Sequence, residues 1–433
     1  MTDLSFSCSE RLLERALKTI PLGSQTFSKS YKHYPKGGSP FFAEKGKGPY
    51  LFDVDGNQFI DMVNGLAAVT LGYCDPDVDT AIIKQVEKGV IFSLSNELEA
   101  LLAEKIAQLI PCAEMSRFGK NGSDATTAAI RLSRAYTGRD EVAVCGYHGW
   151  HDWYIGSTDK KLGVPEATQS LTHKFQFNNI DSLEALFKKR KDKIAAVILE
   201  PMNITYPEAD FLPGVKALCQ EYGAVLVFDE TVTGFRFDLG GAQKIFGVTP
   251  DLATFGKGIA NGMPLSVVTG KKEIMQLLDE VFFSFTYGGE LLSIAAALAT
   301  IEKLEKQSGI QKITTYGTQL KEGLEALISQ FSCSDFLSVS GNPVWSFFNI
   351  HVDEPEELYL WKTLYMQETL KRGLITLGSH NLTLSHDEGV IERVLAIYAE
   401  VIEVFARAKS KGGPGSFLHV DSLTPLFSVR KKD

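Results

Sequence analysis

AVLVFDETVTGFRFDLGGAQKIFGVTPDLATFGKGIANGM, residues 224–263, is the stretch that decides the fold. It holds two short apolar runs, Ala224–Phe228 and Leu252–Phe255, with the length and β-branched character of buried strands. The first run is followed by Asp229, and the second by Gly256 and then Lys257. Open α/β sheets bind their ligands in the crevice beyond the carboxyl ends of the strands, so the pattern places a lysine and an aspartate where a ligand is expected.

The pair Lys257 and Asp229 has a specific chemical use. A lysine amine can form a Schiff base with the aldehyde of a pyridine cofactor, and a carboxylate can pair with the ring nitrogen. The alternative is that both charges cap strands on a solvated rim of the sheet. The motifs in the rest of the chain favour the first interpretation.

Strands and helices alternate along the first three quarters of the chain. Residues 141–145 and 194–199 are apolar strands, and residues 182–193 are a charged helix between them. This spacing predicts an α/β fold in which a mostly parallel sheet has helices on both faces. From about residue 303 the pattern changes to one typical of a smaller α+β domain. We expect an N-terminal segment that packs with the small domain, a large domain and a C-terminal small domain, at 1–65, 66–305 and 306–433.

Composition excludes several classes of protein. The 433 residues are 22% charged and 44% hydrophobic, as in ordinary globular proteins. A net charge of -9 argues against a nucleic-acid partner, and no apolar run approaches the length of a membrane span. Six cysteines without a CxxC pair predict reduced thiols in a cytoplasmic protein. His148 and His151 have no third ligand nearby and no HExxH pattern, so we predict no metal.

Two further segments suit a phosphate and a flat ring. Residues 115–137 read as a short strand, an Asn121-Gly122-Ser123 turn and an alanine-rich helix, whose free N–H groups form an anion site. The turn matches no Walker or dinucleotide pattern. After the strand at 141–145 comes GYHGWHDW, residues 146–153, which is rich in rings that can stack on a planar ligand.

Taken together, these motifs resemble the class III, fold-type I pyridoxal-phosphate-dependent aminotransferases. Within that family the resemblance is closest to the glutamate-1-semialdehyde 2,1-aminomutase group. The segments that carry it are FDETVTGFRFDLGGAQKIFGVTPDLATFGKGIANGMPL (228–265), NGSDATTAAIRLSRAYTGRD (121–140), GYHG (146–149) and FTYGGE (285–290).

The resemblance implies pyridoxal 5′-phosphate (PLP) as the cofactor and a role for each matching residue. Lys257 would hold the cofactor as a Schiff base, and Asp229 would form a salt bridge with the pyridine nitrogen. The other implied cofactor contacts are Gly122 and Ser123 at the phosphate, Tyr147 and Thr231 on the ring faces, His148 at the ring edge, and Glu200 as the carboxylate that orients the cluster. Thr286 would reach the cofactor phosphate of the other protomer, which implies a homodimer with shared active sites.

The departures from the family pattern lie on the substrate side. FTYGGE replaces a Gly-Thr-Leu-Ser-Gly-Asn run of the aminomutases, and their N-terminal substrate loop becomes Gln25–Lys29 here. We expect a mouth of the site lined by Thr26, Lys29, Trp150, His151, Trp153 and His380. Such a lining suits a keto-sugar or a related small aldehyde or ketone as acceptor, with Lys29 binding the carboxylate of a glutamate-type amino donor.

Two alternatives to an aminotransferase remain open. One is glutamate-1-semialdehyde 2,1-aminomutase activity, an amine shift within one molecule that needs no added donor. The other is a non-catalytic PLP-binding regulatory module, although no helix-turn-helix segment or basic stripe accompanies the cofactor motifs.

Overall fold

The computed structural model describes residues 4–424, which form two compact units. The first unit contains residues 4–66, 71–75 and 311–424. The second contains residues 67–70 and 76–310, and it carries the motifs for the expected cofactor. The ends of the expected terminal segments, residues 1–3 and 425–433, lie outside the described residues.

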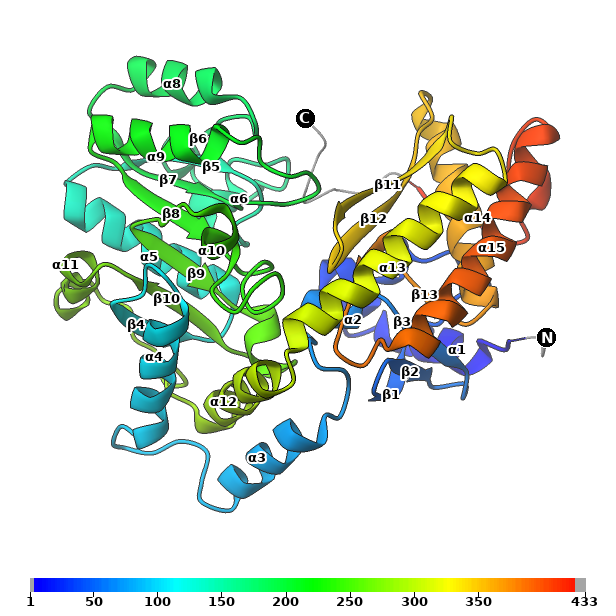
Figure 1. The fold of residues 1–433 in the computed structure, drawn as a ribbon, viewed down its shortest axis with the longest axis horizontal. Helices are drawn as coiled ribbons and strands as arrows, with labels where there is room; N and C mark the ends of the chain where they lie inside the picture. Colours follow the sequence, from blue (N-terminus) through cyan, green and yellow to red (C-terminus); the bar gives the residue numbers. More distant parts are fainter. Residues whose placement is uncertain (1–3, 425–433) are drawn as a thin grey trace. The chain divides into compact units, whose positions relative to one another are not determined.

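A seven-stranded sheet forms the centre of the second unit (Figure 1). Its order is β4-β10-β9-β8-β7-β5-β6. The strands are β4 (Met115–Gly119), β5 (Glu141–Cys145), β6 (Thr172–Lys174), β7 (Ile194–Leu199), β8 (Val225–Asp229), β9 (Leu252–Phe255) and β10 (Ser266–Gly270). β10 pairs antiparallel with β4 and β9, and the pairs from β9 through to β6 are parallel. The mostly parallel sheet predicted from the sequence is confirmed.

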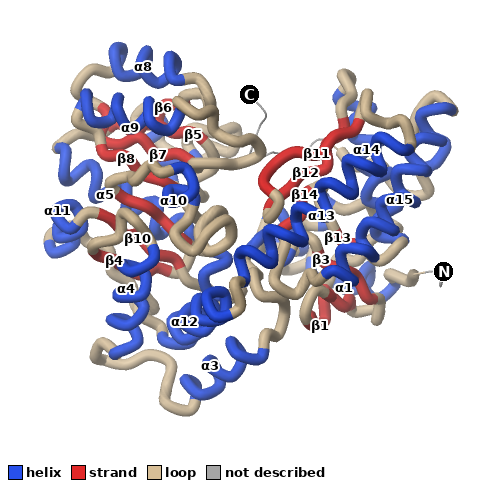
Figure 2. Tube along the Cα trace, viewed as in Figure 1, coloured by secondary structure: helices blue, strands red, loops and turns tan. Residues whose placement is uncertain are grey.

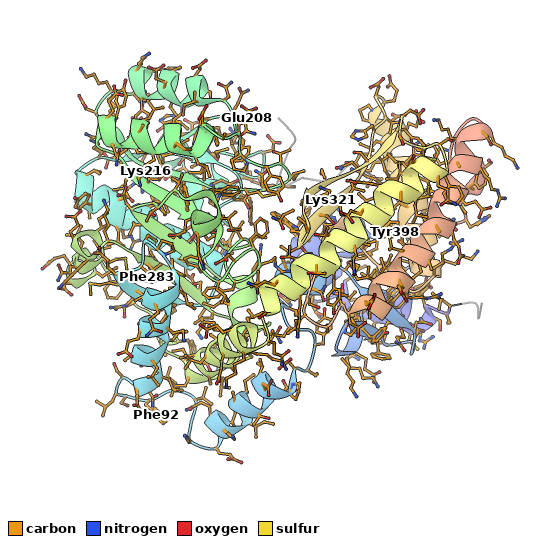
Figure 3. All side chains as sticks on the ribbon, viewed as in Figure 1. Phe92, Glu208, Lys216, Phe283, Lys321 and Tyr398 are labelled. Atoms are coloured by element: carbon orange, nitrogen blue, oxygen red, sulfur yellow. The ribbon has the colours of Figure 1, made fainter. Side chains whose placement is uncertain are left out.

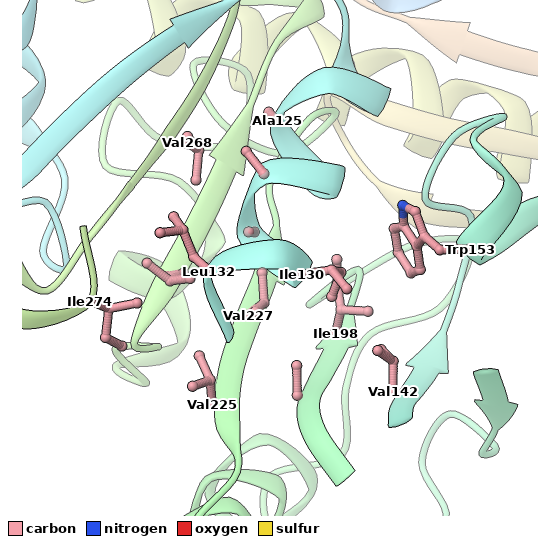
Figure 4. Close-up of a cluster of buried hydrophobic side chains, with 14 of the residues drawn as sticks. Ala125, Ile130, Leu132, Val142, Trp153, Ile198, Val225, Val227, Val268 and Ile274 are labelled. Carbon is pink, nitrogen blue, oxygen red and sulfur yellow. The ribbon is translucent and has the colours of Figure 1, made fainter. Parts of the chain in front are cut away.

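Both faces of this sheet are buried. Every residue of β5, β7, β8 and β9 is buried, so neither face of these strands is left to water. On one face, α5 (Gly122–Thr137) packs its small and branched side chains against Val142, Ile198 and Val227 (Figure 4). Parallel sheets need helices on both faces for this reason, and the continuous apolar runs of the sequence are the result.

The other helices of the second unit connect and cover these strands. α9 (Phe211–Tyr222) packs on β8, and α8 (Ile180–Lys189) packs on α9. α12 (Leu291–Lys306) packs on α3 (Pro76–Val86) and α4 (Glu97–Leu109). The shorter helices are α6 (Asp152–Ile155), α7 (Glu166–Gln169), α10 (Ala242–Phe246) and α11 (Lys272–Met275).

The first unit has the α+β character expected from the sequence (Figure 2). One sheet has the order β1-β2-β3-β13 and a second has the order β11-β12-β14. The strands are β1 (Ala43–Lys47), β2 (Tyr50–Asp53), β3 (Gln58–Asp61), β11 (Leu337–Asn342), β12 (Trp345–Ile350), β13 (Leu374–Ile375) and β14 (Ser379–Asn381). The helices are α1 (Ser7–Ala16), α2 (Asn64–Ala67, which ends in the second unit), α13 (Gly309–Gln330, which begins there), α14 (Pro355–Lys371) and α15 (Glu388–Ser410). Within residues 4–424 the structure contains no helix that is both long and apolar enough to span a bilayer.

The prediction that His380 lines the mouth of the site is wrong, because its side chain is fully buried within the first unit. Trp153 is largely buried as well, but it lines the same pocket as Trp150 and His151. Trp153 packs in the cluster under α5 and donates its Nε1–H to Thr127 Oγ1 at 2.8 Å. His380 has no exposed surface, and its ring lies between Ser346 Oγ at 2.9 Å and the hydroxyl of Tyr398 at 2.6 Å (Tyr398 is labelled in Figure 3). Aromatic and imidazole side chains serve cores as well as binding sites, and the linear pattern does not separate these uses.

We predict that His380 makes the stability of the protein depend on pH. Burial, with a smaller contribution from His386, lowers the pKa of His380 from 6.5 to about 3. The unfolded chain therefore takes up a proton below pH 6.5 that the folded chain refuses until about pH 3. Between these values the free energy of unfolding should fall by about 1.4 kcal/mol per pH unit on this account.

Denaturant unfolding at pH 7.5 and pH 5 checks this prediction against a His380→Gln variant, which keeps a polar side chain but cannot titrate. In the variant, the free energy of unfolding should depend less steeply on pH below pH 6.5, by the contribution of about one proton. An identical slope in both proteins would contradict the assignment.

Candidate active site

Parallel pairing of β8 with β9 brings Asp229 and Lys257 to the same edge of the sheet. Asp229 is the last residue of β8 and lies opposite Thr254 in β9. Two residues after Thr254 the chain leaves β9 at Gly256, and Lys257 follows it as a half-buried residue. The lysine and the carboxylate are therefore at neighbouring carboxyl ends of parallel strands, where α/β sheets place their ligands.

Asp229 is a buried carboxylate that remains ionised. Its Oδ1 accepts hydrogen bonds from the Thr231 hydroxyl at 2.5 Å, the Thr231 N–H at 3.1 Å and the Thr254 hydroxyl at 3.2 Å. Its Oδ2 lies 2.9 Å from Nδ1 of His148. Burial by itself raises the pKa of Asp229, but the bonds from His148 and Thr231 outweigh it and leave the pKa below its ordinary value. The site thus holds a fixed negative charge.

His148 stabilises the negative charge of Asp229 by a direct contact. Its ring is buried, with Nδ1 facing Asp229 and Nε2 facing the carbonyl oxygen of Cys145 at 3.1 Å. Both neighbours are hydrogen-bond acceptors, so a ring protonated on both nitrogens satisfies both contacts. His148 is therefore bound to Asp229 and is fixed in orientation by the end of β5.

The predicted phosphate turn forms the N-terminus of the sixteen-residue helix α5. The Asn121 side chain caps this helix by accepting from the N–H groups of Ser123 at 3.0 Å and Asp124 at 3.3 Å. The Ser123 hydroxyl accepts from the Trp150 N–H at 3.1 Å, so this hydroxyl already lies in a polar network. The helix end combines a positive dipole end with a hydroxyl and a glycine that allows close approach, which suits a phosphate.

The space between these groups fits PLP. A Cβ added to Gly122 or Gly256 would come within 3.1 Å or 3.3 Å of Thr231 Cγ2, so the two glycines keep a path open beside Thr231. Ser266 Oγ is buried without a hydrogen-bond partner within residues 4–424. It opposes Gly119, just before the phosphate turn, where an added Cβ would lie 2.6 Å from it. A glycine-lined cradle, an orphaned hydroxyl and an ionised aspartate match a phosphorylated pyridine.

Tyr147 and Glu200 lie next to His148 in this arrangement. Glu200, just after β7, accepts the Tyr147 N–H at 3.1 Å and is buried. The left-handed Gly146 (φ 108°) makes this contact possible, because a Cβ there would lie 2.7 Å from a Glu200 oxygen. The Tyr147 ring is half-buried and meets Tyr154 edge to face. The structure therefore brings Asp229, His148, Tyr147, Glu200 and Thr231 together at the carboxyl ends of the neighbouring strands β5, β7 and β8.

The predicted substrate residues are divided between the two units. Trp150 is 65% exposed and lines a pocket of about 420 Å³ together with Arg131, Arg134, His151 and Trp153. Thr26 and Lys29 are exposed residues of the first unit, and their contact with substrate stays a prediction. Thr286 is also exposed and lies in the loop before α12.

Sequence reasoning missed residues whose signal was weak. Thr254 and Ser266 look like ordinary strand residues, and only the pairing of β8, β9, β10 and β4 reveals their neighbours. Glu230, beside Asp229, is fully buried and accepts the N–H groups of Ala242 at 2.7 Å and Gln243 at 2.9 Å. The adjacent Asp-Glu pair thus has one carboxylate for the site and one that folds the following loop.

Comparison with known proteins agrees with this geometry. The sequence model of the class-III aminotransferase family matches residues 33–386, so the chain belongs to this family. The 3-aminobutyryl-CoA aminotransferase of Cloacimonas acidaminovorans (strain Evry) is 35% identical over 412 residues, covering 93% of this chain and 98% of the relative. The glutamate-1-semialdehyde 2,1-aminomutase of Caldicellulosiruptor saccharolyticus is 35% identical over 437 residues, covering 94% and 100%.

A solved structure is similar over nearly the same length. The FumI protein of Sphingopyxis sp. MTA144, in its PLP internal aldimine form, matches with a TM-score of 0.87 at 25% identity, covering 95% of this chain and 99% of that one. The chain is therefore a class III, fold-type I aminotransferase with pyridoxal 5′-phosphate as its cofactor, which confirms the family, fold and cofactor predicted from the sequence.

We predict that Asp229→Asn lowers the rate of amino transfer by at least about 10²-fold, the usual cost of removing a preorganised electrostatic group. Because the pKa of Asp229 is below its ordinary 3.8, the native carboxylate is ionised at all pH values above 3.8 and is lost only as pH falls through the folded value. The activity of Asp229→Asn should therefore stay below that of the wild type at every pH across the neutral range.

Asp251→Asn provides the matched control, because Asp251 accepts the Leu226 N–H at 2.8 Å at the opposite end of the same strand pair. Steady-state rates per cofactor-loaded enzyme should be near wild type in this control. Equal losses in the two variants would show that the effect comes from the strands and not from the site.

Proposed function

We propose that the protein transfers an amino group from a donor such as glutamate to a separate carbonyl acceptor, with Lys257 as the covalent anchor of PLP and the carrier of the transferred proton. The observation that supports this most strongly is the position of Lys257 and the ionised Asp229 at neighbouring ends of β9 and β8. A lysine beside a fixed carboxylate, next to a helix N-terminus, matches the three functional groups of the cofactor.

Bound PLP supplies an aldehyde for amines and a ring that accepts electrons from the carbon next to the nitrogen. The residues of the chain divide the remaining work. Asp229 keeps a proton on the ring nitrogen because its own pKa is low. Nζ of Lys257 takes a proton from the substrate carbon that carries the nitrogen and returns it to the carbon on the other side of that nitrogen. Such a positioned proton transfer accelerates a reaction on the order of 10²–10⁴-fold.

The proposed cofactor contacts follow from the same geometry. Gly122 and Ser123 bind the phosphate at the start of α5, and Ser266 supplies a further hydroxyl from below. Thr231 and Tyr147 lie against the two ring faces, and the Tyr147 backbone is held by Glu200 at 3.1 Å. His148 orients Asp229 at 2.9 Å.

The acceptor we propose is a keto-sugar or a related small aldehyde or ketone that carries an anionic group. Trp150 and His151 border the phosphate turn, and the pocket they line also contains Arg131 and Arg134. An exposed indole suits the face of a sugar, and guanidinium groups suit a phosphate or carboxylate. Trp153 lines this pocket as well, whereas His380 is fully buried and does not belong to it.

A second candidate acceptor comes from the relatives. The 3-aminobutyryl-CoA aminotransferase matches along 98% of its length, which favours a 3-oxoacyl thioester. The aminomutase from Caldicellulosiruptor saccharolyticus matches along 100% of its length, which keeps an intramolecular amine shift in consideration.

We predict that enzyme loaded with the aminated cofactor returns to its initial absorbance when a phosphorylated keto-sugar is added in a single turnover. A 3-oxobutyryl thioester and glutamate 1-semialdehyde are the comparison acceptors. Trp150→Ala should lower kcat/KM for the keto-sugar and leave kcat/KM for glutamate unchanged, because each kcat/KM depends only on the half of the cycle in which that substrate reacts. Reoxidation by the thioester alone, or by the semialdehyde alone without any need for glutamate, would identify the alternative activity, and Lys257→Ala should show no reaction.

We further propose that the protein acts as a homodimer in the cytoplasm. Thr286 is exposed at the tip of the loop before α12 and would reach the cofactor phosphate of the other subunit. An apolar surface lies on the α3–α4 region, where Phe92 is labelled in Figure 3. Its exposed members are Ile83, Val86, Val90, Ile91, Phe92, Leu94 and Leu101. Several exposed apolar side chains within one short stretch of sequence are typical of protein interfaces, and six free cysteines suit a reducing compartment.

We predict that Leu94→Asp weakens the dimer by at least about tenfold, because a leucine buried at an interface is worth about 1.5–3 kcal/mol. Leu162→Asp is the matched control, since Leu162 is also highly exposed but belongs to the segment between α6 and α7, outside the α3–α4 region. Sedimentation equilibrium gives the dissociation constants. A monomeric wild-type protein, or equal behaviour of the two variants, would contradict the proposal.

A further inference from the structure

Arg236 is a buried arginine of the central motif that the cofactor does not account for. It lies in the loop after β8 and has no exposed surface. Its Nη2 donates to the carbonyl oxygens of Ala67 and Val69, each at 3.0 Å, and approaches Thr70 Oγ1 at 3.4 Å. Burial lowers the pKa of Arg236 to about 10, so it keeps its charge at neutral pH. Burying a charge costs free energy, and here the hydrogen bonds that compensate the charge go to the backbone of a short segment.

The segment that Arg236 holds, Ala67–Thr70, supports the loop that carries Lys257. The Thr70 N–H donates to Asn261 Oδ1 at 2.9 Å. Gly258, directly after Lys257, packs so closely on this segment that an added Cβ would lie 2.4 Å from Thr70 Oγ1 and 3.9 Å from Arg236 Nη2. The loop after β9 is thus pressed against a segment that is itself fixed by a guanidinium group.

The loop is held in a strained conformation at both of its ends. Lys257 and Asn261 each have φ of 44°, in the left-handed region that residues with a Cβ rarely adopt. Backbone strain of this kind persists only where the surroundings hold it in place. The contacts from Thr70 to Gly258 and Asn261 are such surroundings.

We propose that Arg236 is a positioning residue for Lys257: through Ala67–Thr70 it holds the Gly258–Asn261 loop, and with it the left-handed backbone of Lys257, so that Nζ stays aligned with the site of proton transfer. This inference rests on the proposed role of Lys257. Arg236 touches neither substrate nor cofactor in this scheme, so its loss should affect the rate of the chemical step more than substrate binding.

The first test compares Arg236→Gln with Arg236→Lys in the cofactor-loaded enzyme. Misplacing a reacting group by about 1 Å can cost on the order of 10²-fold in rate. For Arg236→Gln we expect kcat to fall about 10–100-fold with KM for donor and acceptor within about threefold of wild type. The pKa of the lysine–cofactor linkage, read from absorbance against pH, should shift in the same variant. Arg236→Lys keeps the charge but not the planar guanidinium group, so its kcat should lie between that of the wild type and that of Arg236→Gln.

Arg139→Gln is the matched control. Like Arg236, which donates to two backbone carbonyls, Arg139 donates to the backbone: its Nη1 donates to the carbonyl oxygens of Ile194 at 3.1 Å, Tyr222 at 2.7 Å and Gly223 at 3.2 Å, at the opposite ends of the strands. Its loss should lower thermal stability and leave kcat and the absorbance titration of the folded holoenzyme unchanged. If Arg236→Gln behaves in the same way, Arg236 only stabilises the fold and the inference is overturned.

A second pair of variants tests the contact between Gly258 and Thr70 and leaves Arg236 itself unsubstituted. Gly258→Ala should lower kcat and shift the absorbance titration, because the new Cβ must push the loop away from Thr70 Oγ1. Adding Thr70→Ala removes that oxygen, and the next atom is then the Thr70 Cβ at 3.7 Å, an ordinary contact. The double variant should therefore recover most of the rate and the titration. No loss in Gly258→Ala, or no recovery in the double variant, would overturn the inference.

The two levels of proposal fail in distinguishable ways. If the wild-type enzyme shows the pH-dependent absorbance of the lysine–cofactor linkage and Lys257→Ala abolishes it, the role of Lys257 stands whatever the Arg236 variants do. If Lys257→Ala keeps that absorbance and its activity, the proposed function itself is wrong.

Discussion

The pairing of β8 with β9 in parallel is the constraint on which the site depends. Parallel strands bring their carboxyl ends to one edge of the sheet, so Asp229, opposite Thr254, comes to the same edge as Lys257. The same pairing leaves both faces of these strands to be covered by helices, which accounts for their unbroken apolar sequences. A shift in this register would separate the acid from the amine.

Charge inside the second unit is compensated by hydrogen bonds to specific partners. Asp229 is balanced by His148 and two threonine hydroxyls, whereas Glu230 is balanced by backbone N–H groups at the start of α10. Burial raises the pKa of Glu230, while the partners of Asp229 hold its pKa down. The pKa values of two neighbouring carboxylates in one motif are therefore shifted in opposite directions, because one carboxylate faces an imidazole and the other does not.

The cofactor side of the site was predictable and the substrate side was not. Lys257, Asp229 and the Gly122-Ser123 turn lie in short motifs whose neighbours are fixed by strand ends and a helix start, so local sequence contains most of their geometry. His380 was expected at the mouth of the site and is fully buried instead, and Trp153 is largely buried although it lines the pocket beside Trp150. A ring packs inward or outward according to distant neighbours, here Thr127 for Trp153 in α6 and Tyr398 for His380 in β14.

The sequence by itself determined the alternation of strands and helices, the family, the cofactor and the lysine–aspartate pair, because each depends on residues close together in the chain or on a fixed spacing. Only the tertiary structure decided which of the buried charges serves the site and what holds the lysine loop. Arg236 and Ala67–Thr70 are far apart in sequence, and the contact between them forms only when the loop after β8 folds against that segment. Burial and strain are properties of such distant contacts, and no local pattern carries them.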